Sequence, residues 1–296
     1  MRVLKAGRVV ALAAGAFAAL AASVALAQSS GAAASSSLTP TEQLLKDQFV
    51  FDLGGFVVSS NIDGSLSGSA NTENRNLNFD QTFGTNADQT RIRADFLWRI
   101  TERQAVRFSY FNDSVTRTRT LDHDVPWGDY TFLSGAQATA KTSFNVYEGT
   151  YEYSFFKERD YRLALSAGLH VDDLTIKLAG DASLTMPDGT VQSASYTTKN
   201  NSITAPLPVV GLSGEWAATS HLYVDASAQF FGYRYQGIGG NWSLLWAGGT
   251  WMFNHNIGVG LAYNRFQTNL DLNKGSFAGR LNFGYQGAVL YVKGGF

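Results

Sequence analysis

His170 and Asp172 are the residues whose types and spacing most directly suggest catalysis in this 296-residue chain. They lie two positions apart in an alternating segment, so both side chains would leave the same face of a β-strand. An imidazole beside a carboxylate is an arrangement that acts as a general base in hydrolytic enzymes. We therefore take His170 and Asp172 as candidate catalytic residues. The sequence Asp122-His123-Asp124, within the loop expected near 119–135, offers the same chemical groups.

Other signals of enzymatic chemistry are missing from the sequence. It contains no G-x-S-x-G, H-E-x-x-H, Walker or dinucleotide-binding motif. It has no cysteine for a thiolate zinc site, and its formal charge of −1 provides no basic face for nucleic acid. We therefore expect a non-enzymatic protein with no cofactor, no bound metal and no nucleic-acid partner.

A second set of polar residues recurs at alternate positions of apolar segments. If the apolar face of each segment contacts lipid, the charged residues of the other face point into a polar bore. Opposite charges in a narrow bore should pair, because an unpaired buried charge is costly. Such a network is either a structural plug or a charged constriction that selects solutes. We assign to it Arg93, Arg99, Arg107, Glu148, Glu152 and Arg162, with Arg91, Asp95, Glu215, Asp225 and Lys293 on the same faces.

The elements that position these residues are β-strands, because apolar and polar residues alternate with a period of two. The clearest case runs from Tyr161 to Asp172, with Leu163, Leu165 and Leu169 on one face. Several segments reach the length of about nine residues that a tilted strand needs to cross a bilayer. A hairpin hidden within 61–89 would raise the count from ten to twelve. The ten segments lie near 49–60, 90–100, 105–118, 136–156, 161–172, 203–217, 221–235, 241–253, 257–270 and 276–296.

The connections between these segments alternate in length. Four are tight turns, at 101–104, 157–160, 218–220 and 254–256. Longer connections lie between them, near 61–89, 119–135, 173–202, 236–240 and 271–275. Short turns on one side and longer loops on the other are typical of outer-membrane barrels. The pattern predicts an all-β fold: a transmembrane, antiparallel, up-and-down β-barrel of about ten strands, with short periplasmic turns and longer extracellular loops.

The first 48 residues indicate export and a linker. A basic start, an apolar run and Ala25-Leu26-Ala27 predict a signal peptide over 1–27. The Ser/Ala/Gly-rich stretch that follows is typical of a flexible linker. Thr39-Pro40-Thr41-Glu42 has the form of a capping box and predicts a short helix to about Gln48. The domains are therefore 1–27, 28–48 and a barrel over 49–296.

The C-terminal segment 288–296 resembles the closing strand of bacterial outer-membrane β-barrel proteins, such as small OmpA- or OmpW-like barrels. In that family a terminal aromatic residue follows alternating apolar residues, and the barrel-assembly machinery reads this signal. The matching positions of the assembly signal here are Leu290, Val292 and Phe296. The resemblance implies an outer-membrane location in a Gram-negative cell, with outer-membrane lipid, lipopolysaccharide and the assembly machinery as partners. Aromatic residues that suit its interfacial girdles are Trp98, Tyr110, Tyr161, Trp216, Tyr263 and Phe296.

The expected function is that of a non-enzymatic outer-membrane barrel, either a narrow, porin-like channel for small solutes or a structural or surface-interaction protein. One alternative is a barrel-embedded hydrolase acting on envelope lipid or peptide. For this alternative the pairing of His170 with Asp172 resembles that of omptin-type barrel proteases. A second alternative is a soluble periplasmic β-protein that binds a ligand.

Overall fold

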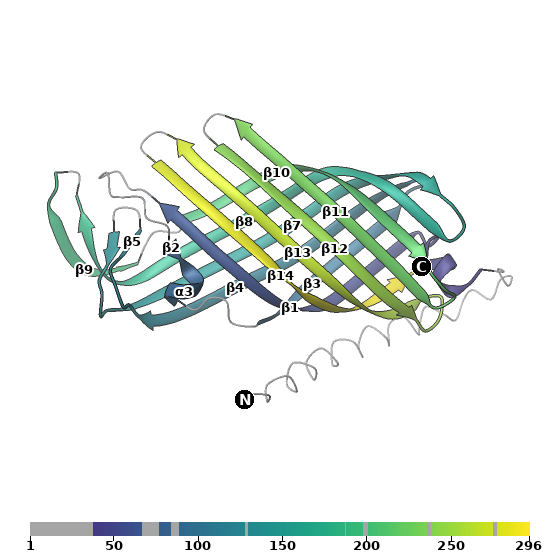
Figure 1. Ribbon diagram of the computed structural model, residues 1–296, viewed down its shortest axis with the longest axis horizontal. Coiled ribbons are helices and arrows are strands. Elements are labelled where there is room, and N and C mark those ends of the chain that lie inside the picture. The colour runs from purple at the N-terminus through teal and green to yellow at the C-terminus, as the bar shows by residue number, and fades with distance from the viewer. Residues whose placement is uncertain are drawn as a thin grey trace.

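The protein folds into one closed barrel of long, tilted strands (Figure 1). This computed structural model describes residues 38–66, 77–83, 89–127, 130–186, 188–197, 201–235, 238–274 and 277–296. Among these residues, no helix is both long and apolar enough to cross a bilayer.

Ten strands form the barrel wall, and each pairs antiparallel with its neighbours in chain order. The wall closes because the last strand pairs with the first, from Val50 opposite Gly295 to Leu66 opposite Gly279. The prediction of an all-β, ten-stranded, antiparallel barrel is therefore confirmed, and the twelve-strand alternative is wrong. The strands are β1 (Phe49–Leu66), β3 (Gln89–Arg99), β4 (Gln104–Thr120), β7 (Gln137–Lys157), β8 (Tyr161–Thr185), β10 (Asn201–Ala217), β11 (Leu222–Tyr235), β12 (Ile238–Met252), β13 (Ile257–Lys274) and β14 (Phe277–Gly295).

The connections differ from the expected pattern: the predicted loops 61–89 and 173–202 are partly strand, because β1 runs to Leu66 and β8 runs to Thr185, and two other predicted loops are short. The segments near 236–240 and 271–275 are not long loops, because β11 and β12 are separated by two residues and so are β13 and β14. A pair of adjacent glycines favours a loop, but Gly239 and Gly240 lie inside β12. They stand opposite Asp271 and Leu270 of β13. Glycine weakens a strand but does not end it when both neighbouring strands continue.

The remaining long connections build an extension beyond the barrel wall, at the left of Figure 1. Strand β8 continues to Thr185 and pairs with β9 (Val191–Thr197). A hairpin of β5 (Val125–Trp127) and β6 (Tyr130–Phe132) pairs with the same part of β8. In the described part of 61–89, the chain forms β2 (Leu77–Asn78) and helix α3 (Phe79–Phe83).

The N-terminal helix α2 (Pro40–Leu44) lies against the short-turn end of the barrel, at the right of Figure 1. The capping box is present: the Thr39 hydroxyl accepts from the Glu42 amide, and the Glu42 carboxylate accepts from the Thr39 amide. The helix ends at Leu44, before the expected Gln48, because the chain must turn there to enter β1. The predicted signal peptide (1–27) and the predicted linker up to residue 37 lie outside the described residues.

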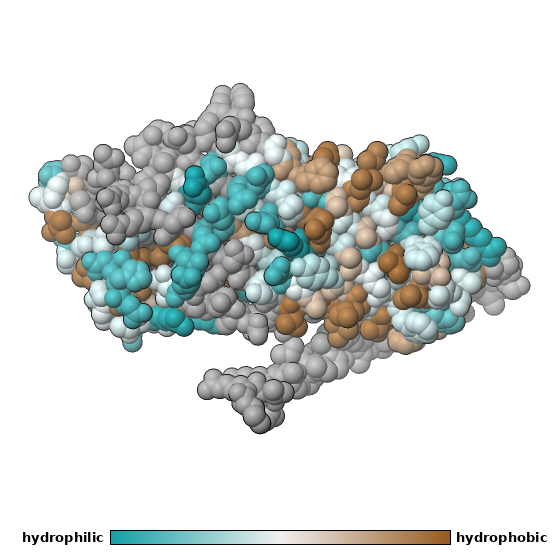
Figure 2. All heavy atoms as spheres, in the orientation of Figure 1, coloured by the Kyte–Doolittle hydropathy of each residue, from teal (hydrophilic) through white to brown (hydrophobic). Residues whose placement is uncertain are grey.

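The outer face of the barrel carries an apolar band over its short-turn half (Figure 2). On β8, for example, the side chains of Leu163, Leu165 and Leu169 are exposed. The aromatic residues expected in the girdles all face outward: Trp98, Tyr110, Tyr161, Trp216, Tyr263 and Phe296. A spanning sheet must close on itself so that every backbone polar group is paired, and this sheet does so. An apolar band on the outside of a closed barrel is the surface that lipid covers.

Candidate functional site

The predicted charge network lies in the bore of the barrel. At the end with the short turns, the bore is closed by helix α2 and the residues that follow it. Arg99 of β3 donates from Nη1 to the carbonyl oxygens of Leu44 and Asp47, at 3.1 and 2.8 Å. Arg162 of β8 donates from Nη2 to the Leu45 carbonyl oxygen at 2.7 Å. The chain just after α2 is therefore fastened to two strands of the barrel wall, β3 and β8.

Apolar packing completes this closure. Leu44 and Leu45 are buried in a cluster of inward-facing residues at the short-turn end. The Thr41 hydroxyl donates to the carbonyl oxygen of Thr219 in the turn between β10 and β11, at 2.5 Å. On the outer side, Arg159 donates from Nε to Glu42 at 2.7 Å. The cluster consists of Leu44, Leu45, Val50, Leu97, Ala105, Ala217, Tyr223 and Met252.

Directly above this segment, one carboxylate joins three arginines. Glu215 of β10 accepts two hydrogen bonds from Arg99 Nη2, at 3.2 and 3.0 Å. Arg107 and Arg162 each place a guanidinium nitrogen within 3.9 Å of the same carboxylate. Arg107 also donates from Nε to Glu152 at 2.7 Å. These groups come from five strands of the barrel, β3, β4, β7, β8 and β10, and link those strands through ion pairs across the bore.

A second layer of charges lies farther from the short-turn end. Arg93 forms two hydrogen bonds with Asp95, at 2.8 and 2.7 Å, and Ser109 donates to Asp95 at 2.5 Å. Lys293 donates to Asp52 at 2.7 Å. The groups leave a cavity of about 30 Å³, which is room for one ordered water molecule.

The structure places all six residues assigned to the lumen network inside the bore. Arg99, Arg107, Glu152 and Arg162 come together around Glu215. The other two, Arg93 and Glu148, belong to the second layer, where Glu148 accepts from Gln229 Nε2 at 2.6 Å.

Sequence reasoning missed one member of the second layer. Asp52 stands between the outward-facing Phe51 and Leu53 in β1, so the alternation could have revealed it as an inward charge. It also missed the fastening of the chain after α2, because backbone carbonyl acceptors leave no signal in the sequence.

The sequence predicts a polar bore along its whole length. This prediction is wrong for the half of the bore that lies away from the short turns. That half is filled by aromatic and aliphatic side chains. Phe266 is central: its ring centroid lies 5.1 Å from that of Tyr285 and 5.8 Å from that of Phe144. Helix α3 adds Phe79 and Phe83, which are fully buried. The aromatic cluster comprises Phe56, Phe79, Phe83, Phe111, Trp127, Phe132, Phe144, Trp242, Trp246, Phe266, Phe283, Tyr285 and Tyr291, with smaller apolar residues between them.

The reason for this reversal is that each strand continues past the apolar band. Along β13, Leu261 and Tyr263 face outward within the band, whereas Arg265 and Gln267 face outward beyond it. Where the outer face meets water it becomes polar, and the inner face becomes the hydrophobic core. Phe266 accordingly points inward.

The candidate catalytic residues lie in or beside this cluster. The His170 ring is 1% exposed, and its centroid lies 4.5 Å from that of Trp242 and 5.7 Å from that of Phe266. Asp172 is on the same strand, but its side chain lies outside the described residues. In the other candidate sequence, Asp124 accepts from the Ser134 amide at 2.7 Å. Among the described residues, no three acidic, histidine or cysteine side chains gather as metal ligands.

The residues of the assembly signal lie where the barrel closes. The backbones of Phe296 and Phe49 exchange two hydrogen bonds, both of 2.9 Å. Leu290 and Phe296 are exposed on the outer face, and Val292 is half-buried there.

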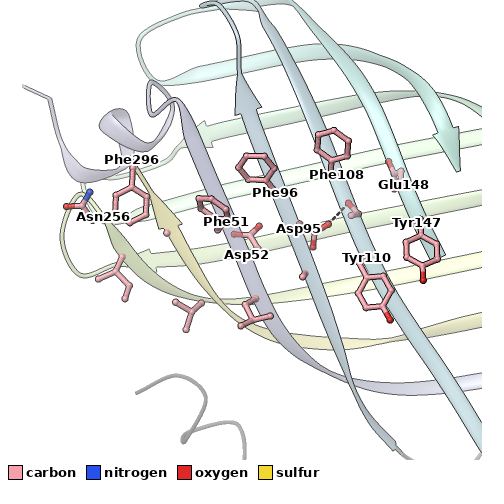
Figure 3. A pocket seen from close by; sticks show the side chains of 16 residues that line it. Phe51, Asp52, Asp95, Phe96, Phe108, Tyr110, Tyr147, Glu148, Asn256 and Phe296 are labelled. Carbon is pink, nitrogen blue, oxygen red and sulfur yellow. Dashed lines mark hydrogen bonds between the residues drawn. The ribbon is translucent and has the colours of Figure 1, made fainter. Parts of the chain in front are cut away.

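An apolar groove of about 790 Å³ runs over β14, β1, β3, β4 and β7 beside this seam. Figure 3 shows the rings of Phe51, Phe96 and Phe108 in a row from three successive strands. The first two are stacked with their centroids 4.7 Å apart. The groove belongs to the apolar band, and its lining suits hydrocarbon chains.

The closure at the short-turn end should depend on pH through Asp47. Burial raises the pKa of Asp47 to about 6, although a hydrogen bond from Gln43 and the charge of Arg99 act in the opposite direction. The ordinary pKa of an aspartate is about 3.9. Docking of 40–47 is therefore most favourable below about pH 4, weakens as the pH rises through 6, and stays constant above.

Hydrogen exchange of segment 40–47, corrected for the intrinsic rate, checks this expectation. We expect less protection at pH 8 than at pH 5 in the wild type, and equal protection at both pH values in Asp47→Asn. Equal protection in the wild type would contradict it.

Comparison with known proteins supports the fold alone. No protein-family model matches the sequence, and a comparison with curated proteins finds no match. Among solved structures, the outer membrane protease OmpT of Escherichia coli matches 88% of this chain and 99% of its own, with 14% identity and a TM-score of 0.53. The toluene transporter TodX of Pseudomonas putida matches 88% of this chain and 93% of its own, with 10% identity and a TM-score of 0.33.

Ail, the attachment invasion locus protein of Yersinia pestis, matches 83% of this chain and 98% of its own, with 6% identity and a TM-score of 0.29. The likeness to OmpT agrees with the strand order, the closure between β14 and β1 and the outward apolar band. The chain has the closed ten-stranded fold of an outer-membrane β-barrel protein.

Proposed function

We propose that this protein is a sealed, non-conducting barrel of the outer membrane with a structural or surface-interaction role. The observation that carries the proposal is the filling of the bore at both ends. The segment around α2 and the ion pairs fill the short-turn half, and the aromatic cluster fills the other. A ten-stranded bore is narrow, so we expect the side chains of the described residues to block a continuous water path.

The extension beyond the apolar band supports a role at the cell surface. Its strands β5, β6, β8 and β9 form a small sheet, whose outer face includes exposed polar side chains such as Ser193 and Ser195. Loops held on a rigid barrel are where barrel proteins commonly contact partners. In this proposal the C-terminal residues Leu290, Val292 and Phe296 are read by the assembly machinery during insertion.

The burial of His170 supports a non-enzymatic role. A general base must come within hydrogen-bonding distance of its substrate. The His170 ring is 1% exposed and packs against the rings of Trp242 and Phe266, so a substrate would first have to displace an aromatic ring. A catalytic role for this residue would need that cluster to open.

Planar-bilayer recording tests the proposal. We expect no unitary conductance steps from the folded wild-type barrel, under conditions in which an open sixteen-stranded porin gives steps. A variant that lacks residues 38–47 should also stay silent, since the aromatic cluster remains in place. Regular steps from the wild type would overturn the sealed barrel in favour of a narrow channel.

A further inference from the structure

The outer wall formed by β1, β14 and β13 changes from apolar to polar between two adjacent rows of side chains. The rows follow from the strand register, in which β14 pairs with β1 on one side and β13 on the other. The lower row consists of Val57, Ala288 and Tyr263, and the upper row consists of Ser59, Gln286 and Arg265. The hydrocarbon of the surrounding bilayer should therefore end between these rows, and lipid headgroups should lie beside the upper one.

A hollow of about 370 Å³ opens in the wall at this level. Gly284 of β14 forms part of its floor, because an outward-facing position without a side chain leaves a gap. Gln267 stands opposite Gly284 on β13, and Gln286 follows two residues along β14. Ser59 and Arg265 complete the polar rim. The hollow thus has a backbone floor and a rim of hydrogen-bonding side chains.

Arg265 is the cation of this rim. It is exposed, and its Nη2 donates to Gln267 Oε1 at 3.5 Å. In the strand register, the nearest described carboxylates on this face are Asp63 and Asp271, four and six residues farther from the band. Asp271 already accepts from Arg280 at 2.9 Å. The guanidinium of Arg265 is therefore placed to bind an anion, and its planar shape favours phosphate.

We propose that this hollow binds the phosphorylated sugar headgroup of an outer-leaflet glycolipid, the phosphorylated glucosamine of lipopolysaccharide. Arg265 binds the phosphate, and Gln267, Gln286 and Ser59 bind sugar hydroxyls. The acyl chains run down the apolar rows over Tyr263, whose hydroxyl donates to Gln286 at 3.1 Å. A soluble sugar phosphate has no chains to cover these rows. The inference rests on the outer-membrane placement proposed above, but not on the sealed bore.

Binding of purified lipid A to the full barrel in detergent micelles, measured by native mass spectrometry, tests the site. We expect Arg265→Gln to weaken binding about tenfold or more, since it removes a charge-assisted contact. Gly284→Val should weaken binding similarly, because it fills the hollow and keeps the charge. The matched control is Arg280→Gln, which removes the same charge from the same wall of the barrel and should change affinity less than twofold.

Three results would overturn the proposal. Equal loss in Arg265→Gln and Arg280→Gln would mean general charge attraction. Equal binding of dephosphorylated lipid A to the wild type would exclude phosphate recognition. Full competition by inorganic phosphate at the concentration of lipid A would mean a free-anion site instead of a lipid site. Bilayer conductance is unaffected by any of these outcomes, so failure here remains distinguishable from failure of the sealed-barrel proposal.

Discussion

Replacing Glu215 by glutamine is expected to lower the free energy of unfolding of the barrel by about 3–5 kcal/mol. The carboxylate lies within 3.9 Å of guanidinium nitrogens from Arg99, Arg107 and Arg162, and it is 8% exposed. Glutamine keeps the size of the side chain and removes its charge. Three inward-facing cations would then face one another, and among the described residues Glu152 would be the one carboxylate left in an ion pair with any of them.

Urea unfolding in detergent micelles, followed by tryptophan fluorescence, measures this change. The matched control is Glu102→Gln, which breaks an exposed ion pair with Lys157 and should cost about 1 kcal/mol or less. If Glu215→Gln unfolded at the same urea concentration as Glu102→Gln, the charge layer would not stabilise the barrel.

Phe266→Ala is expected to have an effect of similar size, about 3–5 kcal/mol, because it opens a cavity inside the aromatic cluster. Phe266 is 1% exposed, and its ring contacts those of Trp242 and Tyr285. The surrounding rings are held by several strands, so the cluster cannot collapse fully into the space.

The control for this variant is Phe230→Ala on the lipid-facing side of β11, where the side chain is 56% exposed. Lipid or detergent chains fill the vacated space there, so the loss should be much smaller. Both variants are compared by the same urea titration and by the temperature at which the folded barrel loses its fast migration on a gel. Equal losses would show that the inner cluster is not a packed core.

The barrel itself could be predicted from the sequence because its signal is local. Segments such as Tyr161 to Asp172 alternate with a period of two, and the tight turns near 157–160 and 254–256 separate neighbouring strands to within about one residue. Closure then follows from physics, since an open sheet edge is not tolerated in hydrocarbon.

The contents of the bore could be predicted only in part. Alternation shows that Glu152 and Arg162 point inward, but not that Arg107 pairs with Glu152 while Arg162 approaches Glu215. Partners across a barrel depend on strand stagger, which is a property of the closed sheet and not of any one strand.

The aromatic cluster was missed for a different reason. The residues Phe283 and Tyr285 alternate with Gly284 and Gln286, which is the same pattern as in the band but with the faces exchanged. The rule that apolar side chains point outward therefore fails where a strand leaves the membrane. The sequence signal for that boundary is the position in a strand at which the apolar residues switch from one face to the other.

The most direct test of a filled bore uses the absence of cysteine from the chain. Single thiols are introduced at Ser166 in the charge layer and at Val209 in the aromatic cluster, where the native side chains are 6% and 2% exposed. A charged, membrane-impermeant thiol reagent is then added to the folded protein, with Ser193→Cys and Ser220→Cys as exposed controls. We predict that both exposed thiols react completely and that the two bore thiols react only after heat unfolding. Rapid labelling of the bore thiols in the folded barrel would show an open, water-filled path and contradict the account.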